Sequence, residues 1–119
     1  MINYVRNYSF LIITAFVLNL EAKDSFFITR EEYGKMLYKE PRGISCDLCH
    51  GPSGESNLIV SYKHKGLQKD LIAPRITNVS KDRFAQAVKY GYSIMPKYEL
   101  TDTEIEVLYL YLSSLGDEL

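Results

Sequence analysis

Three stretches of the chain place apolar residues at the spacing of an amphipathic helix, between residues that favour helix ends. The stretches are 29–39, 80–91 and 101–116. In the third, Thr101 and Glu104 form a Thr-x-x-Glu capping pattern, and the following apolar stripe consists of Ile105, Leu108, Tyr109, Leu112 and Leu115. The pattern therefore predicts three helices with caps at Thr29, Ser80 and Thr101, the last two ending at Gly91 and Gly116.

The segment from Gly51 to Pro74 lacks apolar residues at helical spacing, and its sequence predicts mainly a loop. It contains several turn-forming residues and one short apolar patch at 58–60, and no convincing alternation typical of a strand occurs anywhere in the chain. A loop of this length in a compact domain usually wraps a ligand or has another function. We therefore expect an all-α domain of three or more helices with long loops.

The N-terminal residues have the pattern of a signal peptide. Residues 1–9 carry Arg6 and no acid, and residues 10–20 are almost entirely apolar. This apolar run is shorter than the roughly 20 residues of a membrane-spanning helix. We expect residues 1–22 to be a signal peptide, with an uncleaved tether as the alternative, and residues 23–119 to form one domain.

Composition narrows the classes of protein further. The chain has 119 residues and a formal net charge of -1, so it lacks the basic surface of a nucleic-acid-binding protein. Its two cysteines are too few for a disulfide-dense secreted scaffold. A domain this small often needs a disulfide, a metal or a cofactor for stability.

The two cysteines lie in the pattern Cys46-x-x-Cys49-His50, which is the attachment pattern of c-type haem. Two thiols three residues apart on a helical turn can each form a thioether with one haem vinyl group, while the adjacent imidazole binds the iron. A structural disulfide, a redox dithiol and half of a zinc site are the alternatives. The missing ligands for zinc and the lack of an alternating α/β pattern favour haem, with His50 as the proximal ligand.

A second axial ligand is sought among methionines and histidines. Met95 lies in a short loop between two predicted helices and precedes Pro96, which stiffens the backbone, whereas Met36 lies on an apolar helix stripe. His64 is the alternative, but Lys63 and Lys65 flank it, which is typical of a solvated loop. We therefore predict Met95 as the ligand.

Together these motifs resemble the small class I c-type cytochromes, which are monohaem electron carriers. The resemblance covers residues 31–115 and rests on Cys46-Asp-Leu-Cys49-His50-Gly-Pro and on Gly91-Tyr-Ser-Ile-Met95-Pro96-Lys-Tyr-Glu-Leu. It implies the small cytochrome c fold wrapped round one covalent haem c, with a proline carbonyl that accepts a hydrogen bond from the proximal imidazole. Pro74 is the candidate for that proline. In the family the first and last helices cross at a small residue, here Gly34, that meets an aromatic, here Tyr109 or Tyr111.

The resemblance also implies a function. We expect an exported, periplasmic electron carrier of a respiratory chain that makes and breaks no substrate bond and so is not an enzyme. Its implied partners are membrane respiratory complexes as donors and a terminal oxidase or reductase as acceptor. An open-site haem protein with peroxidase-like or gas-sensing activity is the alternative, which would need a vacant or weakly held sixth position and usually distal acid-base residues.

Four lysines are candidates for partner recognition. Lys63, Lys65, Lys69 and Lys97 could present positive charge near the haem edge and steer an acidic redox partner. The other reading, that they only keep the surface soluble, stays open at this point.

Overall fold

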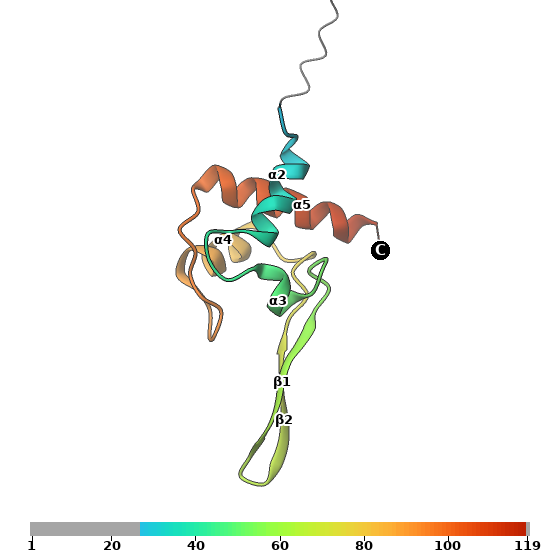
Figure 1. Cartoon of the computed structure of the whole chain (residues 1–119), viewed down its shortest axis with the longest axis vertical. Coiled ribbons are helices and arrows are strands. Elements are labelled where there is room, and N and C mark those ends of the chain that lie inside the picture. The colour runs from blue at the N-terminus through green and yellow to red at the C-terminus, as the bar shows by residue number, and fades with distance from the viewer. Residues whose placement is uncertain (1–26, 119) are drawn as a thin grey trace, which may run out of the picture.

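A computed structural model describes residues 27–118 of the chain, so the expected signal peptide lies outside the described part. The elements follow in the order α2 (Arg30–Lys39), α3 (Cys46–His50), β1 (Asn57–His64), β2 (Leu67–Ala73), α4 (Lys81–Tyr90) and α5 (Asp102–Asp117). The helices gather into a body, and the two strands project from it (Figure 1). Among residues 27–118, no helix is both long and apolar enough to cross a membrane.

Side-chain caps begin the three longer helices where the sequence predicts them. Thr29 Oγ1 accepts a hydrogen bond of 3.1 Å from the Glu32 amide, and the Glu32 carboxylate accepts one of 2.8 Å from the Thr29 amide. Thr101 and Glu104 repeat this box at the start of α5, and Ser80 caps α4. The predicted helices are thus confirmed, except that α5 continues through Gly116.

Helix α2 crosses α5 (Figure 1), and Gly34 of α2 lies at the contact. A Cβ atom on Gly34 would lie 2.5 Å from the Tyr111 Cβ and 2.8 Å from the Val107 carbonyl oxygen, so only glycine permits this approach. The predicted crossing is confirmed, with Tyr111 as the aromatic partner. Around it lies the core of Leu37, Tyr38, Phe84, Val88, Leu100, Ile105, Leu108, Tyr111 and Leu112.

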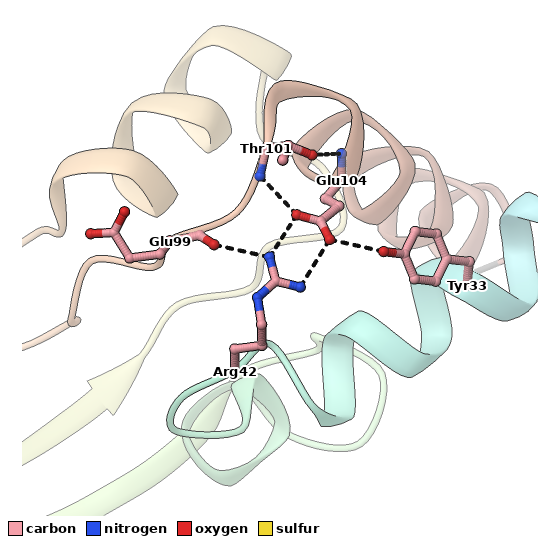
Figure 2. Close-up of polar contacts among 5 residues, drawn as sticks. All are labelled: Tyr33, Arg42, Glu99, Thr101 and Glu104. Carbon is pink, nitrogen blue, oxygen red and sulfur yellow. Dashed lines mark hydrogen bonds and ion pairs between the residues drawn. The ribbon is translucent and has the colours of Figure 1, made fainter.

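The Glu104 carboxylate ties three segments of the body together (Figure 2). It accepts hydrogen bonds from the Tyr33 hydroxyl at 2.8 Å and from both Arg42 terminal nitrogens at 2.9 and 2.7 Å. Arg42 also donates to the Glu99 carbonyl at 2.9 Å. These partners, the Arg42 guanidinium first, hold the pKa of Glu104 well below its usual range. The contacts fix the loop after α2 against the start of α5.

The prediction of an all-α fold was wrong, because residues 57–73 form a two-stranded antiparallel hairpin. Its turn consists of Lys65 and Gly66, with φ of +51° and +77°. This is a two-residue hairpin turn without the Asn-Gly or Asp-Gly signal that would have revealed it. A bulge between Leu58 and Val60 interrupts the register, and nearly all side chains of both strands are exposed. The apolar-polar alternation of a half-buried strand is therefore missing.

Candidate functional site

A cavity of about 720 Å³ opens between the helices and the base of the hairpin. Its lining includes the five residues that the sequence analysis assigns to the haem site, namely Cys46, Cys49, His50, Pro74 and Met95. Apolar side chains dominate the rest, among them Ile44, Ile59, Leu71, Ile76, Val79, Phe84, Val88, Leu100, Leu108 and Leu112. The structure thus brings together residues that are up to 49 positions apart, in a cavity whose size suits a cofactor.

Short-range contacts position the helix that carries the Cys-x-x-Cys-His motif. The Tyr38 hydroxyl of α2 donates a 2.5 Å hydrogen bond to the carbonyl of Gly51, directly after α3. Asp47 of α3 pairs with Lys39 and accepts a hydrogen bond from Ser45. Gly51 ends the helix with φ of +85°. The motif is therefore held on a single helical turn against α2.

His50 is buried, with 7% of its surface exposed, and its ring orientation is fixed by a backbone carbonyl. The Nδ1 atom lies 2.8 Å from the Pro74 carbonyl oxygen. A carbonyl can only accept a hydrogen bond, so Nδ1 carries the proton and the Nε2 lone pair is left for another partner. This tautomer is the one in which an imidazole binds a metal through Nε2.

Cys46 and Cys49 both line the cavity and are not joined in a disulfide. Burial raises the pKa of Cys46 to about 11, with smaller contributions from Asp47 and Cys49. A redox dithiol or a nucleophilic cysteine needs the opposite shift, because the thiolate is the reactive form. The surroundings of Cys46 therefore argue against the redox-dithiol alternative.

Met95 lies in a tight turn after α4. The Met95 amide donates to the Tyr92 carbonyl at 2.8 Å, and the Tyr92 amide donates to the Met95 carbonyl at 3.1 Å. A Cβ atom on Gly91, whose φ is +75°, would lie 2.8 Å from the Met95 carbonyl oxygen. This backbone and the following Pro96 hold the half-buried Met95 side chain at the cavity.

Sequence reasoning missed the role of Tyr98, three residues after Met95. Its hydroxyl donates to the Ile44 carbonyl at 2.7 Å, and its amide donates to the Val88 carbonyl at 2.8 Å. Tyr98 therefore joins the methionine loop to the segment before α3, and its ring lines the cavity. Burial raises the pKa of Tyr98 to about 12. In the sequence, the only signal for this role was an aromatic residue close to the candidate ligand Met95.

The hairpin separates the two candidates for the second axial position. His64 is exposed at the far end of β1 and is not among the residues that line the cavity. Ile59, Leu71 and Ile72, near the base of the hairpin, do line it. The missed hairpin thus contributes part of the cavity wall and carries His64 outward.

The residues of the cavity fit a covalently bound haem. Two thiols, a buried imidazole with a free Nε2 and a thioether share one apolar space. A ligand set of this kind on a small helical body defines a class I c-type cytochrome.

Comparisons with known proteins agree with that class. The family model described as "Cytochrome C oxidase, cbb3-type, subunit III" matches residues 29–112, and the chain belongs to this family of cytochrome c domains. The chain is also similar to cytochrome c-555 of Methylococcus capsulatus, with 32% identity over 92 residues. That alignment covers 71% of the chain and 61% of the relative, so the chain spans less than two thirds of the relative's length. No solved structure matches the chain.

Family membership establishes the cofactor as covalently bound haem c, and Cys46, Cys49 and His50 fit its attachment motif.

Proposed function

We propose that the chain is a monohaem electron carrier of the periplasm, with the haem iron held between His50 and Met95. Cys46 and Cys49 form the two thioethers. The observation that carries this proposal is the shared cavity, which His50 and Met95 both line from separate segments of the fold. Haem c supplies an iron that takes up and releases one electron.

The residues around the iron position would set its properties. Donation of the His50 Nδ1 proton to the Pro74 carbonyl orients the imidazole and makes Nε2 a stronger donor. The Met95 thioether favours the ferrous state more than a second histidine would, and so raises the reduction potential. The apolar cavity wall disfavours the additional charge of the ferric state, and this also raises the reduction potential. No substrate bond is made or broken, so the protein is a carrier and not an enzyme.

The proposed partners follow from the family. Membrane respiratory complexes would reduce the protein, and a terminal oxidase or reductase would oxidise it. Such encounters are brief and bury little surface, which allows rapid turnover. Export by the N-terminal segment would place the protein in the periplasm, because covalent haem attachment to an exported chain takes place there.

A redox titration of the holoprotein, followed by absorption and repeated under carbon monoxide, tests the carrier role. We expect one reversible wave with a slope of about 59 mV per decade, the value for one electron. We also expect the reduced spectrum to stay unchanged under carbon monoxide, because Met95 fills the sixth position. Rapid carbon monoxide binding without denaturant would contradict the proposal and favour an open-site haem protein.

A further inference from the structure

The hairpin of residues 57–73, called the arm below, exposes several apolar side chains to solvent. It projects away from the helices (Figure 1), and its two strands pair only with each other within residues 27–118. Tyr62 is 46% exposed and Leu67 is 67% exposed. An isolated two-stranded hairpin is at best marginally stable, so the fold gains little from it. A group of exposed apolar side chains on such an element marks an interaction site.

The strand register places four apolar residues of the arm on one face beyond the bulge, together with Lys69 and His64. Beyond the bulge, Val60 pairs with Leu71, Tyr62 with Lys69 and His64 with Leu67, and these alternate pairs share a face. We call this the apolar face. The other face has the pairs Ser61 with Asp70 and Lys63 with Gln68, and the Ser61 hydroxyl donates to Asp70 at 2.6 Å. The arm is therefore amphipathic although neither face is buried.

The apolar face begins at the cavity. Leu71, at its inner end, lines the cavity and is half-buried, whereas Val60, Tyr62 and Leu67 continue outward along the arm. A protein bound along this face would also lie at the cavity mouth. This position favours a partner that exchanges electrons with the haem over a partner that only anchors the chain.

Charge is divided between the arm and the body. The arm carries three lysines and one aspartate, whereas the rest of residues 27–118 carries nine basic and twelve acidic side chains. None of the ion pairs among the described residues involves Lys63, Lys65 or Lys69. Their charge is therefore available to an acidic partner, while the acidic body would repel it.

We propose that the arm is the docking element for an electron-transfer protein with an acidic surface around an apolar patch. The patch binds the apolar face, and the acidic rim meets Lys65 in the turn and Lys69, which lies beside Tyr62 on the same face. The partner then lies against the cavity wall at Ile59 and Leu71. This inference rests on the proposed function, because it needs a haem that passes one electron to the docked protein.

The test compares two double variants of the holoprotein with substitutions on opposite faces of the arm. Tyr62→Ser with Leu67→Ser removes the centre of the apolar face, and Ser61→Ala with Gln68→Ala is the matched control on the polar face. The probe is a preparation of respiratory membranes from the cells that make the protein, with dioxygen as the final electron acceptor. The second-order rate of oxidation of each ferrous variant is measured, and a neutral quinone serves as a small oxidant.

We expect the apolar-face variant to react with membranes at least about tenfold more slowly, because central aromatic and aliphatic contacts dominate an interface. The control should stay within about twofold of the wild type. Oxidation by the quinone, the absorption spectrum and Tm should remain unchanged in both variants, which excludes damage to the haem site. Equal membrane rates for both variants would overturn the docking role while leaving the carrier function intact. A wild-type protein that only the quinone oxidises would overturn both.

A second pair of variants tests the charged rim. Lys65→Gln with Lys69→Gln should slow the membrane reaction and flatten its dependence on ionic strength, whereas Arg30→Gln with Lys35→Gln on α2 should do neither. Equal salt dependence in the two variants would contradict the rim contact.

Two further measurements test whether the arm binds a lipid surface or a second copy of the chain instead of a redox partner. Sedimentation with anionic lipid vesicles, if lost in the Tyr62→Ser, Leu67→Ser variant, would assign the arm to a membrane surface and overturn the proposal. Dimers of the wild type that this variant abolishes would assign it to a second copy of the chain and would also overturn it.

Discussion

The helical body and the arm differ in what their side chains contact. In the body, comprising residues 27–56 and 74–118, most apolar side chains pack in a core or line the cavity, although Met36, Leu48 and Leu110 are exposed. In the arm, residues 57–73, most side chains face solvent and the net charge has the opposite sign. The sequence of the body therefore has to satisfy both folding and haem binding, whereas the arm contributes little to folding.

Removal of the haem should have the largest effect, and it should fall on the body. In Cys46→Ala with Cys49→Ala, the walls of a cavity of about 720 Å³ lose their covalently held filling. The loss of this apolar filling removes much of the buried surface on which a domain this small depends for its stability. We expect no cooperative thermal transition by circular dichroism. A transition like that of the holoprotein would contradict this account.

The same leucine truncation in the two regions should give unequal results. Leu108→Ala removes a core side chain that is 2% exposed, and it should lower the free energy of unfolding by about 2–5 kcal/mol. Leu67→Ala removes a side chain that is 67% exposed, and its effect should stay within about 0.5 kcal/mol. Denaturant unfolding of both holoproteins measures the difference. Comparable losses would show that the arm also contributes to stability.

Replacement of one glycine in each region compares how tightly the backbone is constrained in the body and in the arm. Gly34→Ala places a methyl group against Tyr111 and the Val107 carbonyl, and overpacking of this kind costs about 1–3 kcal/mol. Gly66→Ala meets no atom within 4 Å but must keep φ near +77°, which costs about 1 kcal/mol. Denaturant unfolding should therefore rank Gly34→Ala as the more harmful change. The reverse order would mean that α2 and α5 can separate without loss.

Within the body, two glutamates of α5 should differ in their pH dependence. Glu104, with three side-chain and backbone partners, has a pKa well below its unfolded value near 4.5, so its contribution is present above pH 4.5 and is lost as the pH falls further. Glu104→Gln should lower Tm at neutral pH by a few degrees and weaken the loss of stability in acid. Glu106→Gln breaks one exposed pair with Lys81 and should change Tm little. Identical acid profiles for the wild type and Glu104→Gln would contradict this role.

Local sequence signals predicted the body well. The caps at Thr29 and Thr101 act within one helical turn, and the Cys-x-x-Cys-His motif is contiguous, so both can be recognised without knowledge of tertiary contacts. The contact of Arg42 with Glu104 joins residues 62 positions apart and follows only from the packing of α2 on α5. The arm left no convincing alternating pattern, because its side chains are almost all exposed and its short apolar face also includes Lys69 and His64.

The central claim, that one cavity holds a haem iron between His50 and Met95, is tested most directly by the ferric absorption spectrum of two methionine variants. Met95 lines the cavity, whereas Met36 is 56% exposed on α2 and provides the matched control. We expect the weak far-red sulfur-to-iron band in the wild type and in Met36→Ala, and its loss in Met95→Ala. A band that persists in Met95→Ala, or that is absent from the wild type, would contradict the account.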